Sequence, residues 1–234
     1  ARARSGDTGT IRAGRVVDPF DIDRSWSVEA LRGPNGLRRW EKSDIRARSG
    51  DVFQERLYCI RWRKPDGSRA YRAPTPFDLQ NEAKVLDLLG SRIQDWWERG
   101  ILPSKAIEPG YNTDQPMRER GWTHWHHLFT ARQLLVHGTV ATSCALVAGN
   151  APELRVASFL ALGLLANWDS KLCIWNKNLA KSGGIGAFEQ TFANQALNTL
   201  FNYGSRGFSG LESFKLAQFQ YSSSSPISAQ CECL

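Results

Sequence analysis

The sequence predicts an α+β fold, with a basic strand- and turn-rich N-terminal part followed by a mainly α-helical C-terminal part. Apolar residues alternate along residues 56–62, which is typical of a strand. They recur at helical spacing along residues 76–99 and 131–168. The 234 residues suffice to bury a substantial core. We expect three segments: residues 1–74, 75–121 and 122–234.

A β-hairpin is the clearest element of the first segment. Residues 56–62 would form its first strand and residues 68–73 its second. Between them, residues 64–67 (Lys-Pro-Asp-Gly) supply a turn, because Pro presets φ and Gly accepts a left-handed backbone. A short strand is also predicted over residues 10–17, and a turn cluster over residues 32–36.

A helix is predicted to follow this hairpin. Thr75 is a favourable N-cap, Pro76 suits the first helical position, and Gly100 ends the helix. Its predicted apolar face consists of Leu79, Ala83, Leu86, Ile93 and Trp97. Residues 101–121, rich in Pro and Gly, are predicted to form an irregular connector.

Capping signals also mark the predicted start of the helices in the second half of the chain. Thr130 and Gln133 have capping-box spacing, and Phe129 and Leu134 stand where a hydrophobic staple would clamp the helix entry. These signals predict a helix over about residues 131–148.

A second helix is predicted over about residues 152–168, and it would pair with the first as an antiparallel hairpin buried in a larger body. A third helix is predicted over about residues 188–203, and a strand-like tail over residues 221–234.

Positive charge is concentrated near the start of the chain. Residues 1–72 hold 17 Lys or Arg against 10 Asp or Glu, a net charge of +7. A basic lobe is typical of a phosphate-binding surface, although the same charges also serve solubility. Candidate DNA contacts here are Arg38, Arg39, Arg46, Arg48, Arg61, Arg63 and Lys64.

Residues 121–130 form the densest polar and aromatic cluster. It holds three histidines in four positions, but no companion group of Cys, Asp or Glu lies nearby, so we predict no metal site. Aromatic faces stack on unpaired bases, so further candidate DNA contacts are Trp122, Trp125, His126 and Arg132. The alternative is a helix-entry loop packed by its own aromatic side chains.

The motifs of an S-adenosylmethionine-dependent amino-methylase are absent. Such enzymes need a glycine-rich strand-to-helix turn beside the cofactor and an Asp/Asn/Ser-Pro-Pro-aromatic loop that holds a flipped base. Residues 18–23 lack the glycines, the glycines of residues 183–186 do not make a GxGxxG, and the Pro-Pro loop does not occur. We therefore predict no catalytic residue and no cofactor-binding residue, and an isolated chain that is inactive.

The remaining bulk features are those of a cytoplasmic protein. The longest apolar run, residues 159–166, is far shorter than the roughly 20 residues of a membrane span, so no membrane partner is expected. The five cysteines are scattered, which favours free thiols. The only methionine is Met117, and we expect the chain to be a segment of a longer protein.

Residues 121–135 (GWTHWHHLFTARQLL) resemble the signature of large prokaryotic adenine-specific DNA methylases that carry an N-terminal domain of unknown function. The resemblance continues in order through residues 71–75, 108–113, 170–175 and 191–197. In that family the cofactor motif lies upstream and the DPPY-type motif downstream, so the resemblance implies an interior segment.

The resemblance also implies S-adenosylmethionine as cofactor of the parent enzyme, DNA as substrate, the remaining methyltransferase halves as partners, and a role in restriction-modification or phage defence. We thus expect a segment of a DNA (adenine-N6) methyltransferase. The alternative is a non-catalytic DNA-binding or assembly module, which salt-dependent DNA affinity without cofactor binding would favour. A third possibility is a structural helical insert without DNA affinity.

Overall fold

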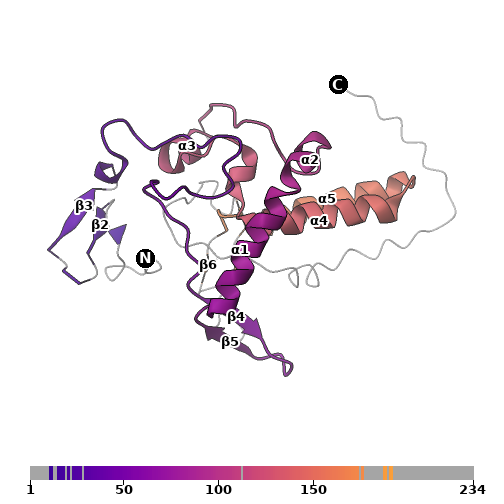
Figure 1. Ribbon diagram of the computed structural model, residues 1–234, viewed down its shortest axis with the longest axis horizontal. Helices are drawn as coiled ribbons and strands as arrows, with labels where there is room; N and C mark the ends of the chain where they lie inside the picture. Colours follow the sequence, from indigo (N-terminus) through magenta and orange to yellow (C-terminus); the bar gives the residue numbers. More distant parts are fainter. Residues whose placement is uncertain are drawn as a thin grey trace.

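The computed structural model describes residues 11–173 except residues 13–14, 19, 22, 28 and 112, together with residues 175–176, 187–188 and 190–191. Short antiparallel strand pairs come first, helices follow, and one further strand pair comes after the last described helix, which confirms the α+β class (Figure 1). The elements in chain order are β1 (Ile11–Arg12), β2 (Arg15–Val17), β3 (Ser25–Ser27), β4 (Ile60–Arg63), β5 (Arg69–Arg72), α1 (Pro76–Gly90), α2 (Ile93–Glu98), α3 (Asp114–Arg120), α4 (Ala131–Ala148), α5 (Pro152–Trp168), β6 (Trp175–Asn176) and β7 (Ala187–Phe188).

The N-terminal strands form a small antiparallel sheet in the order β1-β2-β3, with Val16 opposite Trp26. The single strand predicted over residues 10–17 is therefore wrong, because this stretch folds back on itself as β1 and β2. The turn cluster at residues 32–36 is confirmed, since Gly33 and Gly36 adopt φ values of 68° and 72°. Residues other than Gly rarely adopt this backbone conformation.

The predicted hairpin is confirmed as β4 and β5, in which Trp62 lies opposite Ala70. Gly67 has a φ of 79°, as the turn requires. The first strand begins at Ile60 rather than at residue 56. Continuing the register would place Tyr58 opposite Pro74, and Pro has no N–H with which to extend the ladder.

The one long helix predicted over residues 76–99 is wrong, because α1 ends at Gly90 and α2 starts at Ile93. Gly is a poor helix former, and the Ser91 hydroxyl donates to the Leu88 carbonyl at 2.9 Å, which competes with helix continuation. The buried residues also differ from most of the predicted apolar face. The buried residues are Leu89, Ile93 and Trp96, whereas Leu79 is 52% exposed.

The connector predicted over residues 101–121 contains α3, which the sequence analysis missed. Pro116 lies in the first turn of this helix, where a missing N–H costs nothing. Gly121 ends α3 with a φ of 77°, and a Cβ there would lie 2.1 Å from the Arg38 carbonyl oxygen. Trp40 donates its backbone N–H to the Gly121 carbonyl at 2.8 Å, so the two segments cross at close range.

Helices α4 and α5 match the predicted bounds and lie side by side as an antiparallel hairpin (Figure 1). The expected burial of this hairpin is not seen in the ranges that the structure describes, because one face of α5 is exposed. The third helix cannot start at Phe188, which pairs with Trp175 in the β6–β7 pair. Residues 192–203 and the predicted tail at 221–234 lie outside the described residues.

Two hydrophobic clusters form the described core. The first joins distant segments through Trp40, Trp122, Leu128 and Leu172. The second brings α1, α2 and α4 together through Leu89, Ile93, Trp96, Leu102 and Leu134. Phe129 packs against both clusters, and its contact with the Leu134 cluster is consistent with the predicted staple.

The capping boxes at Thr75 and Thr130 are present. Thr130 accepts a hydrogen bond from the Gln133 N–H at 3.2 Å, and the Gln133 side chain accepts one from the Thr130 N–H at 2.8 Å.

Replacing Thr130 with Ala is expected to lower the free energy of unfolding by about 0.5–2 kcal/mol, measured by urea denaturation. The control is Arg132→Ala, which removes a half-exposed ion pair with Glu82 and should cost at most about 1 kcal/mol. An unchanged Thr130→Ala would contradict the cap.

Candidate functional site: a buried polar junction and a basic hairpin

Lys171 is the most unusual buried side chain, with none of its surface exposed. Its ammonium lies 2.5 Å from a Glu55 carboxylate oxygen, and 4.9 Å and 5.1 Å from the ring centres of Trp40 and Trp122. Burial lowers the pKa of Lys171, and the charge of Glu55 opposes that shift. Burial of a charge is tolerated only when partners replace water, and here one carboxylate and two indole faces do so.

Two buried histidines line the same region. His127 accepts hydrogen bonds at Nδ1 from the Thr123 and His124 N–H groups, at 3.1 Å and 3.2 Å. Its Nε2 lies 3.1 Å from the Glu41 carbonyl oxygen, which can only accept, so the imidazole is neutral with its proton on Nε2. His126 likewise places Nε2 2.9 Å from the Lys42 carbonyl oxygen. Both rings therefore tie the entry of α4 to the segment after Trp40.

These histidines should make stability depend on pH. Burial, the main cause, lowers the pKa of His126 to about 4 and that of His127 to about 3, against an ordinary value of 6.5. Below pH 6.5 these two histidines bind protons in the unfolded chain but stay neutral in the folded chain. The free energy of unfolding is therefore expected to fall as the pH falls. The expected slope is at most about 1.4 kcal/mol per pH unit for each histidine. Urea denaturation between pH 7 and 5 measures it, and a flat profile would contradict neutral buried histidines.

A second set of buried polar groups joins α4 to the end of α5. Gln133 donates its side-chain amide to Asp169 at 3.0 Å, and His137 lies 3.5 Å from the other Asp169 oxygen. Lys171 donates its backbone N–H to the Leu128 carbonyl at 2.7 Å. Residues 121–135 and 170–175, two of the stretches that carry the family resemblance, thus meet here. We call the buried polar junction the set His126, His127, Gln133, His137, Asp169, Ser170 and Lys171, together with Glu55, which pairs with Lys171 and is partly exposed.

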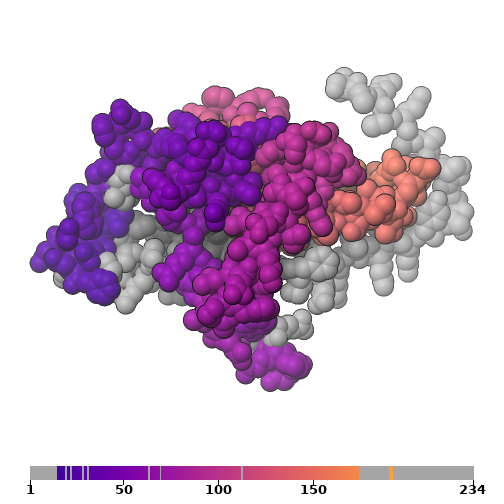
Figure 2. All heavy atoms as spheres, viewed as in Figure 1, coloured from indigo at the N-terminus to yellow at the C-terminus, as the bar shows by residue number. Residues whose placement is uncertain are grey.

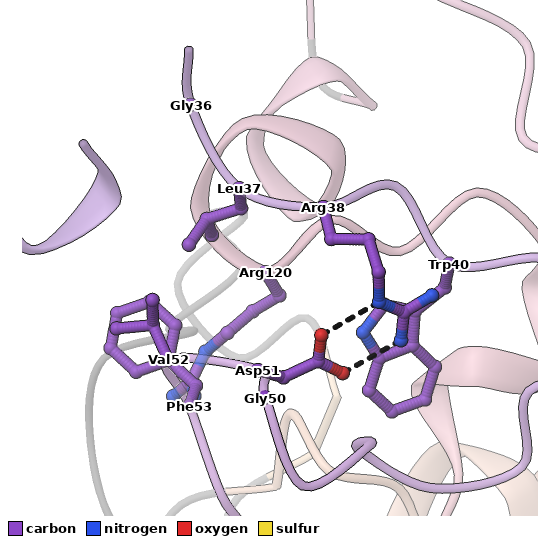
Figure 3. A pocket seen from close by; sticks show the side chains of 9 residues that line it. All are labelled: Gly36, Leu37, Arg38, Trp40, Gly50, Asp51, Val52, Phe53 and Arg120. Atoms are coloured by element: carbon purple, nitrogen blue, oxygen red, sulfur yellow. Dashed lines mark hydrogen bonds and ion pairs between the residues drawn. The ribbon is translucent and has the colours of Figure 1, made fainter. Parts of the chain in front are cut away.

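The buried polar junction holds distant segments of the chain together. Its side chains bond mainly to one another and to backbone groups, and among the described residues no group of three His, Cys, Asp or Glu could hold a metal ion. The nearest hollow has a volume of about 230 Å³ and is lined by residues such as Trp40, Phe53 and Arg120 (Figure 3). Pockets for small-molecule ligands are usually about 300–1,000 Å³, so this hollow is small for a nucleotide cofactor.

Arg38 borders that hollow and is held by carboxylates. It donates two parallel hydrogen bonds to Asp51, both 2.7 Å (Figure 3). It donates a third to Asp44 at 2.6 Å. The pairing with Arg38 lowers the pKa of Asp51. Arg48 also bonds to Asp44, at 2.7 Å. A phosphate would have to displace these carboxylates, so the two arginines brace their loop.

The segment that contains the β4–β5 hairpin is dense in positive charge, and Lys64 and Arg72 are exposed on it. Residues 56–72 hold six Lys or Arg and one Asp, a net charge of +5. Figure 1 shows the hairpin beyond the start of α1, away from the rest of the helices, and Figure 2 shows it as a protrusion. Three aromatic side chains are also exposed along it: Tyr58 at 62%, Trp62 at 47% and Tyr71 at 53%.

The hairpin and α4 share a surface hollow. It has a volume of about 250 Å³ and lies between Ile60 and Trp62 of β4 and one side of α1, with Arg132 from α4 in its lining. Arg132 forms an ion pair with Glu82 at this place. The structure therefore brings Arg132 close to the hairpin, although 60 or more residues separate them in the sequence.

The predicted DNA contacts fall into separate groups. Trp122 and His126 are buried, at 3% and 0% exposure, and Trp125 packs against the Trp40 cluster. Arg39 and Arg46 are exposed on the braced loop, and Lys64 is exposed at the hairpin turn. Arg61 is half-buried in β4, and only the backbone of Arg63 is described. The sequence analysis did not select Arg56, Tyr58, Trp62, Arg69, Tyr71 and Arg72, although the charge density of residues 56–72 signals them.

No protein-family model, curated protein or solved structure matches the chain. No helix within the described ranges is long and apolar enough to cross a membrane.

Proposed function

We propose that this chain is the DNA-contacting segment of an S-adenosylmethionine-dependent DNA (adenine-N6) methyltransferase. The β4–β5 hairpin carries the DNA part of the proposal, because its residues 60–72 combine a net charge of +4 with exposed Trp62 and Tyr71. The methyltransferase part rests on the sequence resemblance of residues 121–135. The cofactor and the catalytic loop would be supplied by parts of the parent enzyme other than this chain.

The hairpin has the dimensions and chemistry for a nucleic acid. A two-stranded ribbon fits the major groove of DNA. Lys64 and Arg72 are exposed and would neutralise phosphates, which releases counterions. Trp62 and Tyr71 offer aromatic faces for unstacked bases, and an adenine must leave the duplex before its amine can be methylated.

The buried polar junction would support this role as a scaffold. It clamps the entry of α4, and α4 carries Arg132 to the hollow beside β4. In this proposal residues 121–135, which carry the resemblance, stabilise the fold, and the β4–β5 hairpin binds the DNA.

The DNA part is tested by the salt dependence of binding. Replacing Lys64 and Arg72 with Ala is expected to weaken binding to duplexes of any sequence and to flatten the slope of log affinity against log salt by about 1–2 units. Fluorescence anisotropy with a labelled duplex at several salt concentrations measures the slope.

The matched control replaces Arg39 and Arg46 with Ala, which removes the same charge from the braced loop. It should leave the slope nearly unchanged. A flatter slope in the control alone would move the interface to the loop, and an unchanged slope in both would remove the hairpin from the proposal. Calorimetry with S-adenosylmethionine should detect no stoichiometric micromolar complex with the chain, and such a complex would contradict its assignment to the other parts of the enzyme.

The second candidate is a non-catalytic DNA-binding or assembly module. It is favoured by the exposed apolar face of α5, which is typical of a surface that another element covers. Methylation of adenine by the parent enzyme, lowered by the Lys64 and Arg72 replacements, would decide for the methyltransferase.

A further inference from the structure

The hollow between β4 and α1 is lined by one face of each element. Two of its residues, Ile60 and Trp62, lie on the same side of β4 because they are two positions apart. The α1 side is formed by four residues at helical spacing: Asp78, Asn81, Glu82 and Val85. The hollow is therefore a product of how a strand and a helix pack together.

The β4 side of the hollow suits a flat ring. Trp62 is 47% exposed, and Ile60 and Val85 add aliphatic surface beside it. Aromatic faces hold unpaired bases by stacking, whatever the base. The volume of about 250 Å³ lies below the range of roughly 300–1,000 Å³ that is usual for whole small-molecule ligands. The hollow therefore fits a single base rather than a nucleotide cofactor.

The α1 side of the hollow is acidic. The carboxylates of Asp78 and Glu82 lie there with one guanidinium, that of Arg132, which pairs with Glu82. Asp78 accepts hydrogen bonds from the Thr75 N–H and hydroxyl on Oδ2, at 2.8 Å and 2.7 Å, so Oδ1 can accept another. The Thr75 bonds lower the pKa of Asp78, which keeps it ionised at neutral pH. Carboxylates repel a phosphate and accept hydrogen bonds from an amine, so this side favours an amine.

Asn81 supplies a polar group that the fold does not use. It is half-buried in the lining, and its side-chain amide makes no hydrogen bond to any described residue. An amide offers a donor and an acceptor side by side. It therefore matches a base edge that joins an amine to a ring nitrogen, as adenine does with N6 and N7. Guanine and thymine present a carbonyl oxygen in place of that amine.

We propose that this hollow binds an unpaired base that carries an exocyclic amine, adenine or cytosine, with its ring on Trp62 and its amine between Asn81 and Asp78. The inference rests on the proposed function, and it names the group that the β4–β5 hairpin would take from the DNA. The sequence has no Pro-Pro-aromatic loop, so the hollow would hold the base without reacting with it.

Fluorescence anisotropy of the full chain with bulged duplexes tests this site. A labelled duplex with one bulged adenine is expected to bind about five-fold or more tightly than the same duplex with a bulged thymine. Asn81→Ala should reduce this preference to less than about two-fold and leave the affinity for the fully paired duplex unchanged, because it alters no charge. The matched control is Gln80→Ala, which removes an exposed amide of α1 outside the hollow and should keep the preference.

Trp62→Leu separates stacking from recognition of the amine. It should weaken binding of the adenine and thymine bulges alike, by about five-fold or more, and keep the preference between them. Equal binding of the two bulges, or equal effects of Asn81→Ala and Gln80→Ala, would overturn the inference, whereas binding of the paired duplex would leave the proposed DNA contact standing. A chain that binds none of the duplexes would overturn both.

Discussion

Replacing Gly138 with alanine is expected to lower the free energy of unfolding by about 2–3 kcal/mol. Gly138 lies inside α4, where the Trp96 ring packs directly on it. An added Cβ would lie 2.2 Å and 2.3 Å from two carbons of this ring. Trp96 is only 4% exposed and belongs to the second core cluster, so it has little room to move.

The test is whether Gly138→Ala destabilises the fold, because the same substitution at most helix positions stabilises it. In a helix interior, Gly→Ala ordinarily stabilises by about 0.5–1 kcal/mol because Gly loses more backbone entropy on folding. Gly163 of α5 is the matched control, since a Cβ there meets nothing within 4 Å. Urea denaturation should show Gly163→Ala unchanged or more stable and Gly138→Ala less stable. Stabilisation of both would show that Trp96 does not lie against α4.

Replacing Lys171 with alanine is expected to cost about 3–5 kcal/mol. The substitution empties the space beside the Trp40 and Trp122 rings and leaves Glu55 without its partner. Most of the cost should come from lost packing, because Glu55 is 26% exposed and can regain water. The free energy of unfolding from urea denaturation measures the loss.

Lys171→Met separates packing from charge. Methionine fills similar space beside the two indole rings without a buried charge. It should therefore lower the free energy of unfolding by less than half as much as alanine does. Lys105→Ala is the surface control. The side chains of its ion pair, Lys105 and Glu108, are 74% and 78% exposed, so losing the pair should change the free energy of unfolding little. If Met and Ala were equally costly, the charge of Lys171 would be the main contribution.

Much of the local structure could be predicted because its causes are local. Thr130 and Gln133 bond within one turn, so four residues suffice to place the start of α4. The same holds for Gly67 in the hairpin turn. The sequence analysis missed the break between α1 and α2, although its causes, Gly90 and Ser91, are local. The burial of Trp96 could not be predicted in this way, because it depends on Gly138, 42 residues away.

The candidate site divides in the same way. The charge of residues 56–72 is a property of the sequence, and so is the absence of a Pro-Pro-aromatic loop. Trp122 and His126 were selected as DNA contacts because composition cannot tell an exposed aromatic cluster from a buried one. Trp122 packs against Trp40, and His126 bonds to the Lys42 carbonyl, so both depend on a segment more than 80 residues away.

By itself, the sequence determined the strand-then-helix order, the capped start of α4, the hairpin turn and the place of the positive charge. Each of these depends on residues within a few positions of one another. The tertiary structure alone decided that Arg38 is bound by Asp51 and that Lys171 is enclosed by Trp40 and Trp122. Burial and ion pairing depend on which distant segments meet, and this is a property of the packed chain, because each partner must be brought out of water by the others.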